Sequence, residues 1–156
     1  MEQTIFRQEQ RRRWFTHYAP LIIWIGVILF LSSPEGSMTQ TSRFIRPLLE
    51  FLFPSISLEQ ILIYHGYVRK CAHFTEYGVL GFFAFRAFSV TQLPRLSSNW
   101  FTAGAALVVA VAAIDEFNQS FEPSRTSSIW DVLLDISGGV FALTICYLWS
   151  HRNKSR

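Results

Sequence analysis

The sequence predicts an all-α membrane protein in which four helices cross the bilayer as a bundle. Half of the 156 residues are hydrophobic and only 16% are charged, against about 25% in ordinary soluble domains. Four apolar runs reach the length of about 17 to 25 residues that a helix needs to cross hydrocarbon. We expect these spans at residues 14–31, 71–90, 100–117 and 129–149. Because four spans leave little chain for anything else, residues 1–156 are expected to form a single domain.

The first span has one alternative explanation, a cleaved signal peptide, because a basic segment precedes it. Its apolar run of about 18 residues exceeds the usual 7 to 15 residues of such peptides. The sequence Ser32-Ser33-Pro34 that follows is also a poor match to a cleavage site. We therefore expect this span to be retained.

The basic residues predict on which side of the membrane each end lies. Nine of the fourteen Lys and Arg residues lie in the two terminal tails or around the turn between the second and third spans. Nine of the eleven Asp and Glu residues lie at or beyond the opposite ends of the spans. Because cytoplasmic segments are enriched in Lys and Arg, both termini are expected in the cytoplasm. The net charge of +3 is then a signal of topology and not of nucleic-acid binding.

The segment 32–70 is expected on the outer side, with short helices lying in the membrane interface. Arg46 and Glu50 are four residues apart on one side of the apolar stretch 44–53. Ser57 and Gln60 fit a capping box that would start a second short helix at 58–64. Such amphipathic helices lie along membrane surfaces. They would either roof the polar residues described next or cover the edge of the bundle.

Ionisable residues concentrate near the outer ends of the last three spans, where a charge is costly unless it is paired or functional. Because residues three and four positions apart share a helix face, we expect them to form one polar site. The residues are Arg69, Lys70, His73, Glu76 and Tyr77 on the second span, Asp115, Glu116 and Gln119 on the third, Arg125 in the next loop, and Asp131 and Asp135 on the fourth. Structural roles remain open. Asp131 fits a capping box with Ser128, Glu76 could pair with His73 or Lys70, and Arg125 could pair with Glu122.

Small residues follow the last of these carboxylates on the fourth span. Gly138 and Ala142 form a small-xxx-small pair on the face that carries Asp135. Such pairs let helices approach closely in lipid. Because the glycines lie within a helix and not in a loop before one, close packing explains them better than a phosphate cradle.

These polar positions form an ordered pattern across the four spans. The pattern reads Ser32-Ser33-Pro34, Arg69-Lys70-x-x-His73-Phe74-x-Glu76-Tyr77-x-x-Leu80, Asp115-Glu116-x-x-Gln119, and then Pro123, Arg125, Ser128, Asp131, Asp135, Gly138 and Gly139. It resembles the VanZ family of small bacterial membrane proteins over about residues 20–148. The resemblance implies a place in the bacterial cytoplasmic membrane and a link to resistance against the glycopeptide teicoplanin. It assigns no catalytic role to any residue.

Two functions fit the polar site. In the first, the site binds, and converts, the head group of a lipid-linked, phosphate-bearing envelope substrate. The binding candidates are Lys70, Arg69, Gln119, Arg125 and Tyr77, and the catalytic candidates are His73, Glu76, Asp115, Glu116, Asp131 and Asp135. His73 could transfer protons, whereas Asp115, Glu116, Asp131 and Asp135 could hold Mg²⁺ or another divalent cation.

In the second function the protein is not an enzyme. The same charges form a structural network between helices, and the outer surface binds a lipoglycopeptide or a partner in envelope synthesis. A transporter is disfavoured, because the inner halves of the spans carry no acidic residue. The sequence also lacks the phosphate-loop, GxSxG and HExxH motifs.

The expected topology can be measured with reporter fusions. A reporter fused after residue 95, in the turn between the second and third spans, should be found on the cytoplasmic side of the membrane. A matched fusion after residue 56 should be found on the outer side. A periplasmic signal from the fusion at residue 95 would reverse the assignment of sides.

Overall fold

The chain folds entirely into helices in the part that the structure describes. A computed structural model describes residues 2–33, 38–121 and 128–154. These ranges hold six helices and no strand. The helices are α1 (Glu2–Leu31), α2 (Met38–Leu52), α3 (Leu58–Phe88), α4 (Pro94–Ser98), α5 (Trp100–Gln119) and α6 (Ile129–Lys154). The prediction of an all-α fold is confirmed.

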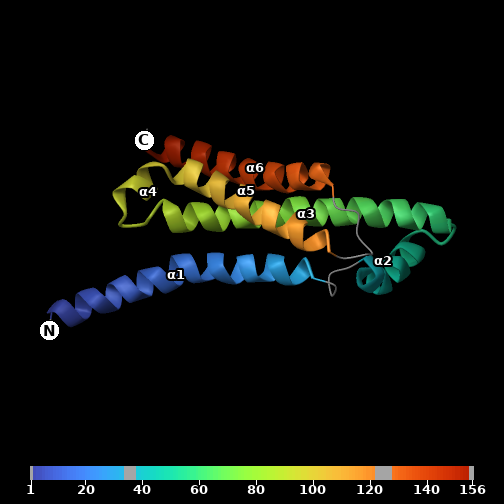
Figure 1. The fold of residues 1–156 in the computed structure, drawn as a ribbon, viewed down its shortest axis with the longest axis horizontal. Coiled ribbons are helices and arrows are strands. Elements are labelled where there is room, and N and C mark those ends of the chain that lie inside the picture. Colours follow the sequence, from blue (N-terminus) through green and yellow to red (C-terminus); the bar gives the residue numbers. More distant parts are fainter. Residues whose placement is uncertain (1, 34–37, 122–127, 155–156) are drawn as a thin grey trace.

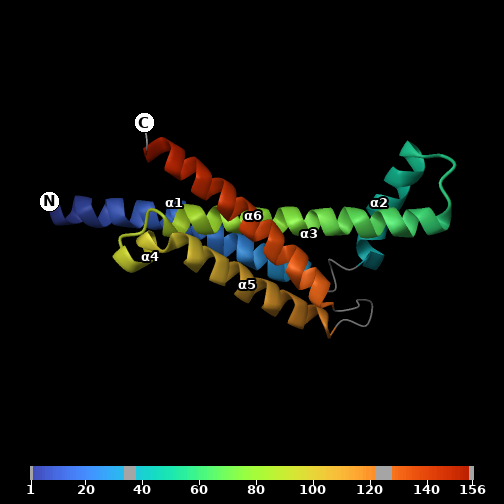
Figure 2. The same cartoon turned by 90° about the horizontal axis from the view of Figure 1, so that it is seen from above.

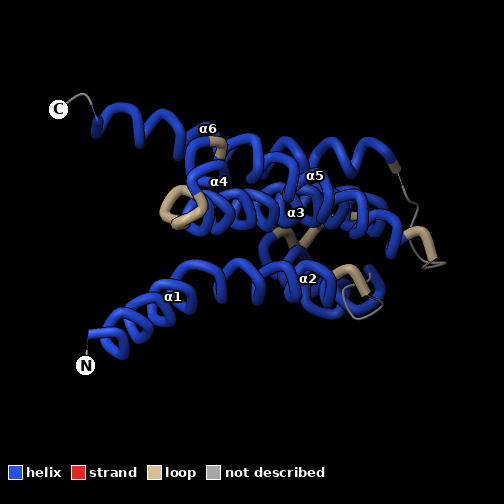
Figure 3. Tube along the Cα trace, turned by 60° about the vertical axis from the view of Figure 1, so that its left-hand side comes forward, coloured by secondary structure: helices blue, strands red, loops and turns tan. Residues whose placement is uncertain are grey.

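Four long helices run lengthwise beside one another, with α3 at the centre (Figure 1). This helix contacts α1, α5 and α6, and its first part contacts α2. The first residues of α1, the last residues of α6 and the short helix α4 lie at one end of the molecule. Helix α2 lies across α3 at the other end (Figure 2). A view from another side shows α2 behind the end of α1 (Figure 3). The start of α1 and the end of α6 therefore lie at the same end of the molecule, and the side of the membrane that they face stays a prediction.

The outer surface of the long helices is apolar. Two helices are long and apolar enough to cross a membrane, Trp100–Gln119 and Ile129–Arg152, and Phe15–Leu31 is a shorter apolar helix. Only 28% of each of the two apolar windows is buried, which is unlike the core helix of a soluble protein. Large apolar side chains such as Ile23, Ile145 and Leu148 are more than half exposed. Soluble monomers rarely expose so much apolar surface. Two of the predicted spans are therefore long and apolar enough to cross a membrane, and that all four helices cross it stays a prediction.

Helix α3 is longer than the predicted span and corrects one expectation. The capping box is present, since Ser57 accepts a hydrogen bond from the Gln60 N–H and the Gln60 side chain accepts one from the Ser57 N–H. It starts a continuous helix of 31 residues and not a separate short helix at 58–64. No proline interrupts this stretch, so the helix continues for about 46 Å, beyond the roughly 30 Å of hydrocarbon. Its first turns therefore extend past α5 and α6.

The other predicted interfacial helix is present as α2. Arg46 and Glu50 lie on one side of it, with Nε and Oε1 2.8 Å apart. Pro47 lies inside the helix. Helix α1 begins twelve residues before the predicted span, and α4 was not expected from the sequence.

Glycines set the distance between α3 and α6. A Cβ added at Gly138 would collide with the backbone carbonyl of Phe74, and one at Gly81 with the carbonyl of Gly139. A Cβ at Gly139 would collide with Val108 of α5. Such backbone contact is open only to glycine, and it agrees with the predicted packing role of Gly138. The contact brings α6 against the part of α3 that carries the polar residues.

Replacing one of these glycines should destabilise the protein. The change Gly138→Ala is expected to cost about 1–3 kcal/mol, because backbone at a helix contact cannot move aside easily. The matched control is Gly26→Ala in α1, where an added Cβ meets nothing within 4 Å. The control should be neutral or stabilising by up to about 1 kcal/mol. Thermal unfolding in detergent measures both, and equal melting temperatures would contradict the role of this contact.

Candidate functional site

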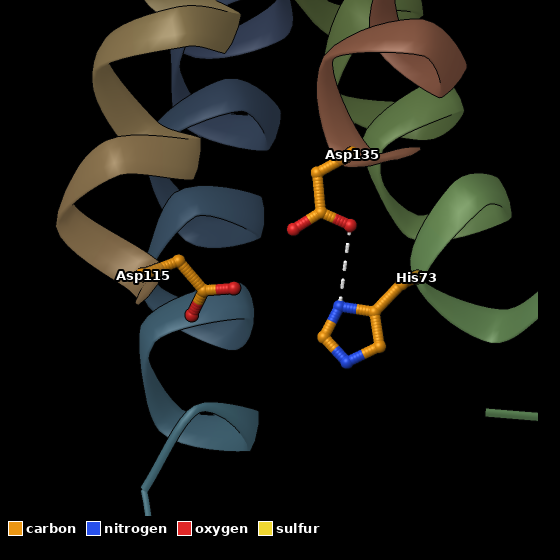
Figure 4. Close-up of side chains that lie close together, drawn as sticks. All are labelled: His73, Asp115 and Asp135. Atoms are coloured by element: carbon orange, nitrogen blue, oxygen red, sulfur yellow. Dashed lines mark ion pairs between the residues drawn. The ribbon is translucent and has the colours of Figure 1, made fainter. Parts of the chain in front are cut away.

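Three helices bring His73, Asp115 and Asp135 together. One ligand atom from each residue lies within 4.8 Å of the others. His73 comes from α3, Asp115 from α5 and Asp135 from α6, and the two carboxylates point towards the space between them (Figure 4). Both aspartates are only 2% exposed. The sequence analysis placed all three residues at one depth, and the structure places their side chains at one point.

Asp115 is held by a network that joins three helices. The Tyr77 hydroxyl donates to its Oδ2 at 3.1 Å, and the Gln119 Nε2 donates to the same oxygen at 3.0 Å. Arg69 Nη2 lies 3.5 Å from the Gln119 Oε1. The Ser32 hydroxyl, from the end of α1, donates to the backbone carbonyl of Asp115 at 3.2 Å. The carboxylate orientation is therefore fixed through its Oδ2.

The second pair in the cluster is His73 with Asp135. The His73 Nδ1 lies 3.4 Å from the Asp135 Oδ1, which is an ion pair if the imidazole is protonated. Neither atom has a hydrogen-bond partner among the described residues. The Asp115 Oδ1 is also buried without a partner in that part of the chain. Buried polar atoms usually have partners, so these atoms indicate a functional site.

A cavity of about 160 Å³ adjoins the cluster. This volume exceeds the roughly 10–15 Å³ that one water needs. Its walls come from four helices, with apolar side chains from α1 and α2 and most polar ones from α3. The lining residues are Ile28, Leu31, Ser32, Ile45, His65, Val68, Arg69, Ala72, His73, Glu76 and Asp115. Helix α2 therefore forms one wall of the site, in line with the roofing role considered for it.

His65 was missed as a candidate residue. It is only 2% exposed, and its Nδ1 lies 3.2 Å from the Ser42 hydroxyl of α2. Burial, together with the charge of Arg69, lowers the pKa of His65 below its ordinary value. Its signal is the spacing of His65, Arg69, His73 and Glu76, at intervals of four, four and three residues on one helix face. That spacing is informative only if the helix begins before residue 65.

The remaining predicted residues lie around the cluster. Glu116 accepts a hydrogen bond from the backbone N–H of Ser128, so its carboxylate caps α6 from a neighbouring helix. Ser128 does not form the expected box with Asp131, because its hydroxyl accepts from the Trp130 N–H at 3.2 Å. Asp131 is half-buried and Lys70 is exposed. Arg125 lies outside the described residues. The chemical roles assigned to all these residues stay predictions.

Glu76 lies in the cavity wall on the α1 side. Its backbone carbonyl accepts a hydrogen bond from the Trp24 Nε1 at 2.9 Å, which ties α1 to α3. Its side chain lines the cavity. The sequence analysis did not single out Trp24, because a lone tryptophan in an apolar span gives no signal of its own.

The fold and the site together define an all-helical protein with apolar helices and a buried polar centre. The chain belongs to the VanZ/LLP1 family, whose model matches residues 17–150. This confirms the family resemblance of the polar pattern. No curated protein and no solved structure matches the chain.

The network around Asp115 predicts the effect of removing one hydroxyl. The change Tyr77→Phe should cost about 1–3 kcal/mol, because it removes a buried hydrogen bond to a carboxylate. The control is Tyr67→Phe on the same helix, at a side chain that is 62% exposed. Thermal unfolding in detergent should show a lower melting temperature for Tyr77→Phe alone. An unchanged melting temperature would contradict the stabilising role of this bond.

Proposed function

We propose that the protein is a multi-pass protein of the bacterial cytoplasmic membrane with both termini in the cytoplasm. Support comes from the apolar outer surface of the long helices and from the basic residues gathered at one end of the molecule. In this arrangement α1, α3, α5 and α6 all cross the bilayer as a four-helix bundle. The cavity then lies near the outer membrane surface, and α2 lies in the outer interface.

The cavity is proposed to bind the phosphate-bearing head group of a lipid-linked envelope substrate. The observation that carries this proposal is a cavity with Arg69 and His73 in one wall and apolar side chains from α1 and α2 in the others. Arg binds phosphate through paired N–H donors. The apolar walls suit the first carbons of a lipid chain. Leu31 of α1 lines the cavity and is 45% exposed, so on this proposal a lipid would reach the site from the bilayer on the α1 side.

The same residues support conversion of the bound head group. His73 lines the cavity and lies beside a buried carboxylate, Asp135, that can orient its ring. An imidazole held in this way is suited to proton transfer to or from a phosphate ester oxygen. Arg69 is held through Gln119 and would neutralise the phosphate charge. Turnover of a phosphate-bearing envelope lipid would also connect the protein to glycopeptide resistance, including that against teicoplanin.

A second candidate function is not enzymatic. The observation that favours it is that Asp115 binds Tyr77 and Gln119 while its backbone carbonyl accepts from Ser32, so that polar bonds join three helices. On this proposal the polar residues only position the helices, and the outer surface binds a lipoglycopeptide or a partner in envelope synthesis.

Replacing Arg69 separates the two functions. With the purified protein in detergent, Arg69→Gln should weaken binding of polyprenyl phosphate and of phospholipid phosphate by about tenfold or more, because a hydrogen bond to a charged group contributes about 1.5–3 kcal/mol. The matched control is Arg43→Gln on α2, which removes the same charge from an exposed position. Phosphate release from the same lipids measures turnover.

Two outcomes contradict the lipid-phosphate proposal. One is the absence of specific binding and turnover with all of these lipids in the unmodified protein. The other is a parallel loss of abundance, melting temperature and function in Arg69→Gln, which would favour the structural network, because loss of one member of a buried charged network costs about 3–5 kcal/mol.

A further inference from the structure

The polar cluster contains three donor atoms that converge on one point. Atoms of His73, Asp115 and Asp135 lie within 4.8 Å of one another, and each comes from a different helix. In Figure 4 the aspartate side chains face the same space and the imidazole closes it on one side. A cluster of carboxylates alone does not define a metal site, so the partners of each oxygen decide the question.

Two of the carboxylate oxygens are buried without a hydrogen bond in the described part of the chain, although one of them lies beside His73. The Oδ1 atoms of Asp115 and Asp135 have no hydrogen-bond donor among the described residues, and each residue is 2% exposed. The His73 Nδ1 has no hydrogen-bond partner there either. An unsatisfied buried acceptor is costly, and a carboxylate more so than a neutral group. A bound cation would satisfy both oxygens at once.

The hydrogen bonds on Asp115 leave its unpartnered oxygen available. Tyr77 and Gln119 both donate to Oδ2, at 3.1 and 3.0 Å, so the network orients the carboxylate while Oδ1 stays free. Metal-binding side chains are typically oriented in this way by neighbouring donors.

The charges around the cluster also favour a cation. Asp115 and Asp135 are two acids buried close together, which is unfavourable unless a positive charge offsets them. A protonated His73 would offset one of them, and Arg69 reaches the cluster only through Gln119 among the described contacts. A divalent ion would offset both carboxylates while His73 stays neutral and binds through a ring nitrogen.

The donor atoms and their spacing indicate the class of ion. One imidazole nitrogen with two carboxylate oxygens suits Zn²⁺ or Mn²⁺, whereas Mg²⁺ and Ca²⁺ prefer oxygen donors alone. Around a tetrahedral Zn²⁺, donors at about 2.0–2.2 Å from the ion lie about 3.3–3.6 Å from one another. The His73 Nδ1 and Asp135 Oδ1 are 3.4 Å apart, inside this range.

We infer that His73, Asp115 and Asp135 bind one divalent transition-metal ion, Zn²⁺ or Mn²⁺, in the wall of the cavity. His73 and Asp115 line that cavity, so an ion held by them would be accessible from it. Catalytic metal sites keep a position open for water or substrate. The inference rests on the proposed function and changes one part of it. The ion would lie where a phosphate oxygen of the head group could bind it, and His73 would hold the ion in place of transferring a proton.

Metal binding is tested on the full chain in detergent, in the absence of lipid. After treatment with a chelator, calorimetric titration with Zn²⁺ and Mn²⁺ should give one site per chain, and Mg²⁺ should bind more weakly. Asp115→Asn and Asp135→Asn should abolish this site, and Tyr77→Phe should weaken it by about 10- to 100-fold through the lost orienting bond. The control is Glu59→Gln, which removes an exposed carboxylate from the first turn of α3 and should bind as the unmodified protein does.

A spectroscopic measurement identifies the donors independently of protein stability. Electron paramagnetic resonance of bound Mn²⁺ should show coupling to one imidazole nitrogen, and His73→Gln should remove that coupling. Absence of a site for either ion in the unmodified protein overturns the inference, whether or not the variants fold. Preference for Mg²⁺, or binding that survives both aspartate changes, overturns it as well.

The metal inference and the lipid proposal can fail separately. Metal binding without any binding of polyprenyl or phospholipid phosphate would contradict only the proposed substrate. Specific phosphate-lipid binding that persists after chelation, in a protein that binds neither ion, would contradict only the metal site.

Discussion

The burial of two carboxylates where three apolar helices meet is the constraint on which the rest of the structure depends. Asp115 and Asp135 are almost fully enclosed. Such groups are tolerated inside a protein only with hydrogen bonds and counter-charges, because taking a charge out of water is costly. The hydrogen bonds from Tyr77 and Gln119 compensate one oxygen of Asp115, and the nearby imidazole compensates Asp135 in part. Stability and chemistry at this point therefore depend on the same few side chains.

Helix packing, with glycines at the contact between α3 and α6, brings the carboxylates to this point. The backbone contact of Gly138 with Phe74 holds α6 against α3 about one turn after Asp135 on α6 and directly after His73 on α3. In lipid, the hydrophobic effect does not drive apolar helices together, so close backbone packing and buried polar bonds contribute most of the association. The glycine contact and the polar cluster are then two parts of one interface. A change at the glycine contact is therefore expected to displace the polar cluster, because Gly138 and Asp135 lie on the same helix.

Much of the fold and of the polar set could be predicted from the sequence, because both depend on local pattern. Apolar run length located the helices, and helical spacing placed His73, Asp115 and Asp135 at one depth. The partners of each group could not be predicted, since they depend on tertiary contacts. Glu116 caps α6 in place of the expected Asp131 because the end of α5 lies beside the start of α6. The continuous start of α3 was missed because a capping box marks where a helix begins but not how far it extends. His65 was missed for the same reason.

The cavity has basic and acidic groups close together. This combination suits a phosphate that binds together with a cation better than a phosphate that binds alone. Arg69 and Asp115 both line the cavity, and the side-chain amide of Gln119 contacts both of them. A phosphate bound by Arg69 alone would face the acids and be repelled by them. A cation held by the acids would remove this repulsion and attract the phosphate. The close placement of base and acids, unfavourable for an anion on its own, is thus the arrangement expected if an ion and a phosphate bind together.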